Sequence, residues 1–200
     1  MVNYFGTPQI ETDRLILRKM VLSDANKAYD HWLSDERVSD NRVSAAHKTE
    51  LETIRRIEKI VSNYPNKDFC WWAIEREADN ELIGEIDLYD FDNTTGNCEV
   101  SYTVGFHWWN QGYGTEALMA VVEFGFLHMN IHKIAAAHNM DNPASGKVMN
   151  KVGMVQEGII RHKIRNAKNQ YKDCAIYGIL QEDYFMKNEK DQNCILSIAK

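Results

Sequence analysis

One stretch of the sequence constrains the fold more than any other. Residues 98–117 read CEVSYTVGFHWWNQGYGTEA, a strand-like pattern that runs into a turn with two glycines, Gly112 and Gly114, and then opens a helix. Because glycine has no side chain, such a turn can expose its backbone N–H groups. The helix N-terminus directly behind the turn adds unpaired N–H donors and positive partial charge. The stretch therefore predicts a binding site for phosphate groups.

The size and charge of the chain narrow its class. Its 200 residues suit one domain with a full core. A net charge of −6 argues against direct nucleic-acid binding, which usually requires a basic face, and is compatible with a basic or amine partner. The N-terminus has no apolar signal core, and no run of about 18 apolar residues occurs, so we expect neither secretion by that route nor a membrane span.

The cysteines and histidines indicate a reducing compartment without a metal. The four cysteines stand far apart and form no CxxC pair, which disfavours disulfides and zinc and fits the cytoplasm. The seven histidines form no spacing such as HExxH. We therefore expect a cytoplasmic protein with no metal site.

The order of predicted elements indicates an α+β fold. Three closely spaced strands between residues 69 and 104 predict an antiparallel meander, and one crossover after it predicts a mixed sheet. We expect residues 1–182 to form a single domain and residues 183–200 a C-terminal tail that is partly disordered. The predicted strands cover residues 10–18, 69–75, 81–89, 99–104, 133–138, 155–164 and 171–180; the predicted helices cover 24–33, the segment behind the capping box at 49–52, 115–129 and 143–152.

A dinucleotide is a poor match for the predicted phosphate site. The segment GYGTEA at residues 112–117 fits the loose pattern GxGxxA, but that fingerprint requires repeated βαβ units and an acidic residue about 20 positions on, at the end of the next strand. Here the preceding strands are predicted antiparallel, and Asp141 comes only in a later loop. A Walker loop is absent. Another phosphate-rich cofactor is favoured.

Four segments together carry a family resemblance. These are ETDRLILRKM at 11–20, ELIGEIDL at 81–88, GYGTEA at 112–117, and NPAS at 142–145 followed by MNKVGM. They resemble the Gcn5-related N-acetyltransferase (GNAT) superfamily, and within it the branch of the RimJ and RimL ribosomal-protein N-terminal acetyltransferases, over roughly residues 10–182.

The resemblance implies a fold and a cofactor. The fold is a mixed, mostly antiparallel sheet of about seven strands, splayed in the middle and flanked by about four helices, and the cofactor is acetyl-CoA. One departure is Trp109, where the superfamily usually has Gln or Arg. An aromatic residue at this place resembles the RimJ/RimL branch, and it puts in doubt any role for a polar side chain there.

The resemblance also implies which residues hold the cofactor. Asn142 would contact the cofactor, although its residue type and position alone indicate a helix N-cap. Likewise, the glycine turn taken alone could be a plain strand–helix connection. Lys147 and Lys151 stand four apart and would either meet the 3′-phosphate or form a solvated helix face. The backbone groups implied for the pantetheine arm are those of Thr103, Val104, Gly105 and Phe106, and those for the pyrophosphate belong to Asn110, Gln111, Gly112, Tyr113, Gly114 and Thr115.

Two residues are the candidates for proton transfer. The resemblance places Ser145 near the sulfur as the general acid for the departing thiolate, although it could be an ordinary first-turn residue. It places Glu99 on the acceptor side as the general base, directly or through water, although a strand residue there could be half of a cross-strand charge pair. Glu85 and Asp87 on the neighbouring strand are reserves. Trp32, Trp71, Trp72 and Trp108 are candidates to shape the acceptor groove or to fill the core.

The nature of the acceptor rests on the amine's own chemistry. An α-amine with a pKa near 8 is already about one tenth neutral at pH 7, whereas deprotonating a lysine costs roughly 4–5 kcal/mol. We therefore expect direct acetyl transfer, without a covalent enzyme intermediate, to a protein N-terminal α-amine. The alternatives are a small amine (a polyamine, amino acid or aminoglycoside) and a non-catalytic CoA-binding regulatory module. The sequence leaves open whether the protein forms a homodimer.

Overall fold

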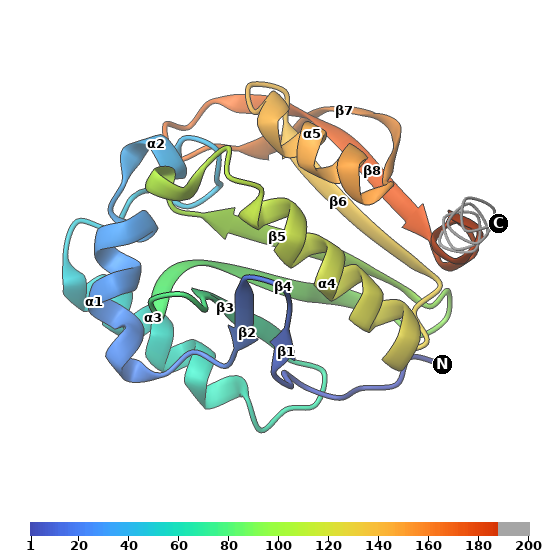
Figure 1. The fold of residues 1–200 in the computed structure, drawn as a ribbon. Helices are drawn as coiled ribbons and strands as arrows, with labels where there is room; N and C mark the ends of the chain where they lie inside the picture. The colour runs from blue at the N-terminus through green and yellow to red at the C-terminus, as the bar shows by residue number, and fades with distance from the viewer. Residues whose placement is uncertain (188–200) are drawn as a thin grey trace, which may run out of the picture.

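The centre of the fold is an eight-stranded sheet, seen in a computed structural model that describes residues 1–187 (Figure 1). The strand order is β1-β2-β3-β4-β5-β6-β8-β7, and every neighbouring pair is antiparallel except β5 and β6. This confirms the predicted α+β class and the antiparallel meander. The strands are β1 (Ile10–Glu11), β2 (Leu15–Arg18), β3 (Cys70–Arg76), β4 (Glu81–Asp92), β5 (Asn97–Val104), β6 (Lys133–Asn139), β7 (Val155–Arg165) and β8 (Tyr171–Leu180).

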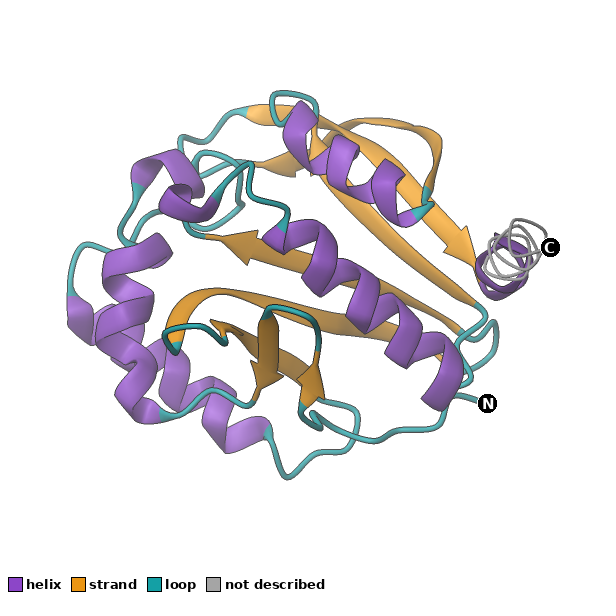
Figure 2. Ribbon diagram, viewed as in Figure 1, coloured by secondary structure: helices purple, strands orange, loops and turns teal. Residues whose placement is uncertain are grey.

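Helical segments cover both faces of the sheet (Figure 2). One apolar core packs α4 against β2 to β5, and a second packs α1 and α3 against the opposite face, with Trp32, Ile57 and Ala73 at its centre. Two separate cores explain why the chain carries so many apolar residues on both sides of β3 and β4. The helical segments are η1 (Leu22–Asp24), α1 (Ala25–Ala28), η2 (Tyr29–Leu33), α2 (Glu36–Ser39), α3 (Glu50–Asn63), η3 (Phe106–Trp108), α4 (Tyr113–His128) and α5 (Pro143–Val152).

The first predicted strand is broken in two, which adds the eighth strand. The Thr12 N–H donates to the Leu15 carbonyl at 2.9 Å, and the Leu15 N–H donates to the Thr12 hydroxyl oxygen at 3.0 Å. These two bonds close a tight turn between β1 and β2, which then pair antiparallel. The prediction of one strand over residues 10–18 passed over the polar run at residues 12–14, which is where the turn lies.

The start of α3 and the C-terminal segment differ in detail from the prediction. Thr49 precedes α3 as expected, but the capping box does not form: the Glu52 carboxylate accepts the Lys48 N–H at 2.9 Å, one residue further back. At the other end, residues 181–187 are helical, and most of the predicted tail, residues 188–200, lies outside the described residues. The division of the chain at residue 182 stays a prediction. Within residues 1–187, no helix has the length and apolar character needed to cross a bilayer.

The parallel pair β5–β6 is short and then opens. Register partners are Asn97 with Lys133, Cys98 with Ile134, and Glu99 with Ala135, and pairing stops there. Beyond this point β6 stays paired with β8 along its whole length, so β5 and β6 diverge (Figure 1). The second half of β5 therefore presents a strand edge toward the gap, which is the splayed sheet that the resemblance implied.

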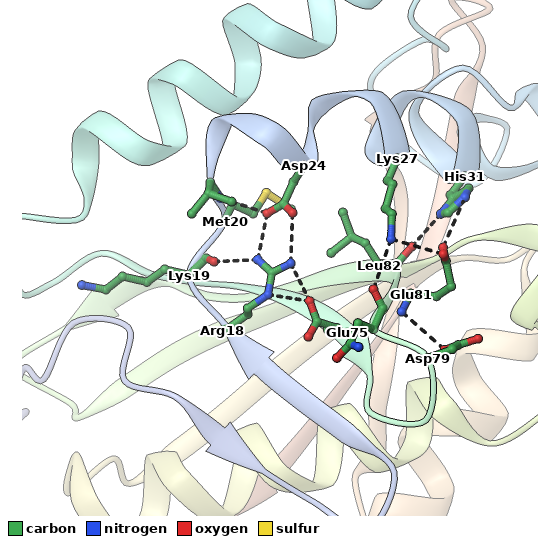
Figure 3. A network of polar contacts seen from close by, with 12 residues as sticks. Arg18, Lys19, Met20, Asp24, Lys27, His31, Glu75, Asp79, Glu81 and Leu82 are labelled. Carbon is green, nitrogen blue, oxygen red and sulfur yellow. Dashed lines mark hydrogen bonds and ion pairs between the residues drawn. The ribbon is translucent and has the colours of Figure 1, made fainter.

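An ion network fixes the first helical segment to the sheet (Figure 3). Arg18 at the end of β2 donates to both carboxylate oxygens of Asp24, at 2.8 and 3.0 Å, and to Glu75 on β3 at 2.7 Å. Asp24 also accepts the Val21 N–H at 2.9 Å, which satisfies an open donor at the start of η1. One buried carboxylate thus joins the strand end to the helix start.

A second group of contacts, also drawn in Figure 3, anchors the next turn of helix. Lys27 donates to Glu81 at 3.2 Å, and the His31 Nδ1 lies 2.7 Å from the Leu82 carbonyl. These contacts tie α1 and η2 to the start of β4. Together the two sets of contacts hold η1, α1 and η2 against the sheet.

Replacing Asp24 with alanine should destabilise the fold. The change leaves the half-buried Arg18 with Glu75 as its one carboxylate partner in the described residues and removes the acceptor of the Val21 N–H. Breaking such a buried pair costs about 3 kcal/mol. Urea unfolding, read as the midpoint at constant m, measures the loss. The matched control is Lys27→Ala, whose more exposed pair with Glu81 should contribute about 0–1 kcal/mol. Equal losses in the two variants would contradict this account.

Candidate active site

A cleft of about 1050 Å³ lies where β5 and β6 part. Its walls come from the second half of β5, the starts of α4 and α5, the segment 38–44 and the β7–β8 hairpin. Three predicted site residues, Gly105, Phe106 and Gln111, are not among the lining residues. The predicted residues that do line the cleft are Glu99, Thr103, Val104, Asn110, Gly112, Tyr113, Gly114, Thr115, Asn142 and Ser145.

The glycine turn has the geometry that a phosphate site requires. Gly112 is the N-cap of α4 at φ +87°, a left-handed conformation that side chains disfavour. Arg14 holds the turn from outside: it donates to the Gln111 carbonyl at 3.1 Å and pairs with Glu116 at 2.6 Å. The N-terminus of a long helix therefore faces the cleft with its first N–H groups open to a ligand. Arg14 was missed in the sequence because it lies about 100 residues away, and only the fold brings it here.

The backbone of β5 offers hydrogen-bonding groups to the gap. The Gly105 N–H points to β4, where it donates to the Ile83 carbonyl at 2.8 Å. Because backbone groups alternate sides along a strand, those of Val104 and Tyr102 point toward the gap and those of Thr103 point to β4. Val104 was predicted as a partner for an extended ligand, and Tyr102 was missed. Strand alternation is the signal that could have found it.

Trp109 has a structural role at the place where the sequence departs from the superfamily pattern that it resembles. Its indole N–H donates to the Val104 carbonyl at 2.6 Å. Its own backbone N–H donates to the Phe106 carbonyl at 3.2 Å, and the Phe106 ring lies outside the cleft with the Arg37 guanidinium over it at 3.7 Å. The aromatic side chain thus closes the turn between β5 and α4, a task that needs no charge.

The start of α5 places a hydroxyl at the cleft. Asn142 is the N-cap and Pro143 occupies the first turn, as predicted. The Asn142 side-chain amide donates to the Ser145 hydroxyl oxygen at 2.9 Å, which leaves the Ser145 hydrogen available for another acceptor. The Tyr102 hydroxyl donates to the Ser145 carbonyl at 3.1 Å and so connects β5 with α5 across the gap. Burial raises the pKa of Tyr102 to about 12, so this donor stays protonated.

On the face of the sheet opposite to the Tyr102 and Val104 side chains, β5 and the neighbouring β4 carry a row of acidic side chains. Glu99 lines the cleft and is half-buried, and its carboxylate accepts the Tyr89 hydroxyl at 2.8 Å. Within residues 1–187 no cation pairs with Glu99. On the same face of β4 follow Asp87 and Glu85, opposite Ser101 and Thr103 of β5. Glu99 is therefore the carboxylate in this row that an incoming cation can reach unopposed.

Glu85 is fully engaged with two arginines. Arg56 binds both of its oxygens, at 2.9 and 2.8 Å, and Arg42 approaches at 3.3 Å. Burial by itself would raise the pKa of Glu85, but the two guanidiniums outweigh it and the pKa is lowered. The pair joins α3 and the segment after α2 to the sheet. A carboxylate held in this way is a poor proton acceptor, so Glu85 does not serve as a reserve base.

Asp87 has the opposite environment. It is 5% exposed, and its one hydrogen-bond donor in the described part of the chain is the Ser101 hydroxyl, at 2.5 Å. Burial raises the pKa of Asp87 to about 7; the Ser101 bond opposes this, and the nearby Glu85 charge adds to it. Ser101 itself is exposed and lines the cleft.

The remaining candidates divide between cleft and core. Trp71 and Trp108 line the cleft, whereas Trp32 and Trp72 are wholly buried in the two apolar cores and do not shape a groove. Trp32 and Trp72 were wrong as groove residues because a tryptophan at strand or helix spacing looks the same on either face. Lys147 and Lys151 line the cleft along α5, and Lys163 of β7 joins them from the other wall.

Comparisons with known proteins agree on one family. The acetyltransferase (GNAT) domain model matches residues 14–155. The uncharacterized N-acetyltransferase YoaA of Bacillus subtilis (strain 168) is 29% identical over 174 residues, covering 87% of this chain and 97% of that protein. A crystal structure of a GNAT-family acetyltransferase from Bacillus anthracis superimposes with a TM-score of 0.77 at 27% identity, covering 88% of this chain and 99% of that one.

A more distant structure shares the fold. It is the spermidine N-acetyltransferase from Vibrio cholerae in complex with CoA and spermine, with a TM-score of 0.74 at 18% identity, covering 87% of this chain and 99% of that one.

The chain belongs to the GNAT family and is an acetyl-CoA-dependent N-acetyltransferase. Its own residues fit acetyl-CoA: a left-handed glycine at the start of α4, an open strand edge on β5 and lysines along α5 all border one cleft. The predicted cofactor and fold class are thereby confirmed.

Blocking the glycine turn should abolish cofactor binding. Acetyl-CoA at 100 times its dissociation constant should stabilise the protein by about 2.7 kcal/mol, read as a rise in melting temperature. Gly112→Val should lose this rise, because a side chain at φ +87° strains the backbone and covers the N–H groups. Gly158→Ala, where an added Cβ has nothing within 4 Å, is the control and should keep it. An intact rise in Gly112→Val would place the phosphates elsewhere.

Proposed function

We propose that this protein transfers the acetyl group of acetyl-CoA directly to a protein N-terminal α-amine. The observation that carries the proposal is the cleft at the β5–β6 gap. It joins a helix N-terminus at one end to the unopposed carboxylate of Glu99 at the other. An anion site and an amine site thus share one continuous space, on the two sides of one strand.

The proposal assigns the cofactor to the helix starts and the β5 edge. The N–H groups of residues 110 and 112–115 hold the pyrophosphate, and the Val104 N–H and the backbone groups of Tyr102 hold the extended arm. Lys147 and Lys151 meet the 3′-phosphate. When bound, acetyl-CoA supplies an acetyl thioester whose carbonyl carbon is the electrophile.

Ser145 is the proposed acid. Its hydroxyl oxygen is already accepting from Asn142, so its hydrogen is free to point toward a departing thiolate. Asn142, the N-cap of α5, also accepts the Ser145 N–H at 3.4 Å, and this second bond keeps the Ser145 hydroxyl in place.

Glu99 is the proposed anchor on the acceptor side. An amine enters mostly as the ammonium at neutral pH, and a half-buried carboxylate without a cation partner attracts it. The carboxylate is within the same row as Asp87, so a proton leaving the amine has acceptors close by.

The charge arrangement favours a single amine over a polyamine. A polyamine carries several ammonium groups and requires several free carboxylates. Of the two glutamates that line the cleft, Glu85 is already neutralised by Arg42 and Arg56, which leaves Glu99. An α-amine also needs less activation than a lysine, by roughly 3 kcal/mol from their reference pKa values. Both points support an N-terminal acceptor.

A matched pair of peptides tests the acceptor. A short peptide with a free N-terminus should release CoA thiol in the presence of acetyl-CoA, and the same peptide with a blocked N-terminus and a free lysine should not. The assay reads thiol release over time, with spermidine, free amino acids and an aminoglycoside in parallel. Faster reaction of the blocked peptide or of spermidine would overturn the N-terminal assignment. Absence of turnover with every amine would favour a non-catalytic CoA-binding module.

Ser145→Ala should lower turnover about 10- to 100-fold while acetyl-CoA still raises the melting temperature. The backbone N–H that Asn142 caps is retained in the variant, so the start of α5 should be intact. Ser62→Ala, an exposed serine on α3 far from the cleft lining, is the control and should leave turnover unchanged. Unchanged turnover in Ser145→Ala would reduce its role to helix structure.

A further inference from the structure

A buried carboxylate stands directly behind a hydroxyl of the cleft wall. Asp87 on β4 and Ser101 on β5 are register partners, and the Ser101 hydroxyl donates to Asp87 at 2.5 Å. Ser101 lines the cleft two residues from Glu99 on the same face of β5. The donated hydrogen bond turns the free lone pair of the Ser101 oxygen away from Asp87, where it can accept a proton from a ligand in the cleft.

We propose that Ser101 and Asp87 form a proton relay that deprotonates the acceptor's ammonium, while Glu99 holds that ammonium by its charge. This inference rests on the proposed function and names the residues that make the amine nucleophilic. It assigns the proton to the buried carboxylate of Asp87 and not to the half-buried carboxylate of Glu99.

The proton step is balanced within the protein. An N–H proton of the ammonium passes to the Ser101 oxygen as the Ser101 hydroxyl proton passes to Asp87. The amine keeps its electron pair and becomes neutral, Ser101 returns to a hydroxyl, and Asp87 becomes a carboxylic acid. Asp87 later releases the proton to water. It also borders a second pocket of about 290 Å³, which shares Trp71 and Tyr89 with the cleft and offers a route for this release.

The surroundings of Asp87 set when it can accept a proton. Glu85 on its own strand raises the pKa, and Arg56 of α3 and Arg42 of the segment after α2 lower it. Glu99 and Tyr89 lie along the same face, and Asp68, Asp90, Cys70 and Tyr4 border the second pocket. Burial dominates, so the pKa of Asp87 is about 7, a value suited to a base that works near neutral pH.

The first test compares pH–rate profiles with the acceptor found in the peptide panel. In the wild type, kcat/KM should rise through about pH 7 as Asp87 ionises. In Asp87→Asn and Ser101→Ala the rise should move up to the amine's own pKa near 8, with a loss of about fivefold at pH 7 and recovery above about pH 9. Ser101→Thr keeps the hydroxyl and should restore the wild-type profile.

Two comparisons separate the relay from other roles. Glu99→Gln should raise KM at every pH without moving the profile, because it removes an anchor and not the base. Asp92→Asn and Thr95→Ala remove a similar hydroxyl–carboxylate pair, at 2.8 Å in the exposed β4–β5 turn, and should change nothing. A pH-independent loss in Asp87→Asn and Ser101→Ala, or a shifted profile in Glu99→Gln alone, would overturn the relay. Absence of wild-type turnover with every amine would instead overturn the proposed function, and the relay with it.

A second test does not depend on activity. A carboxyl whose pKa is raised by folding stabilises the protein below its unfolded value near 4, and this stability is lost as pH rises through the folded value of about 7. The melting temperature of Asp87→Asn relative to wild type should therefore become more favourable between pH 5 and about pH 8. A difference that is constant with pH would show that Asp87 is ionised throughout and would overturn the relay.

Discussion

The early end of the β5–β6 pairing is the constraint on which the rest of the site depends. Parallel pairing needs a crossover, here through α4, and the crossover brings β6 beside β5 for three register pairs. Beyond them β6 continues along β8, which lies on its other side, and diverges from β5. If the ladder continued, the backbone groups of Tyr102 and Val104 would be used within the sheet. Because it stops, the strand edge, the N-termini of α4 and α5 and the cleft between them are all open to one ligand.

β5 then sorts two kinds of chemistry by the simple alternation of a strand. Tyr102 and Val104 lie toward the α4 face, where the tyrosine connects to α5 through Ser145. Glu99, Ser101 and Thr103 lie on the other face, opposite the acidic row of β4. A single strand thus separates the side that suits phosphates from the side that suits an amine, within a few ångströms and without a domain boundary.

Two buried carboxylates on neighbouring positions of one face show how partners decide function. Glu85 is matched by two arginines and stays charged, and its ion pairs hold α3 and the segment after α2 in place. Burial raises the pKa of Asp87 to near neutrality, and within residues 1–187 its one hydrogen-bond donor is a serine hydroxyl. The same residue class, one register step apart, is structural in one case and poised for proton transfer in the other.

What the sequence determined by itself was local. The Gly112 turn, the Asn142 and Pro143 helix start and the antiparallel meander are encoded in adjacent residues, because turn and cap geometry depends on which side chains stand within a few positions. The family resemblance added the splayed sheet and the cofactor. Only the tertiary structure decided that Trp32 and Trp72 are core, that Arg14 supports the turn, that Arg42 and Arg56 neutralise Glu85, and that Ser101 covers Asp87. These pairings depend on strand register and on which helix covers which face, and contacts between residues far apart in sequence leave no local pattern to read.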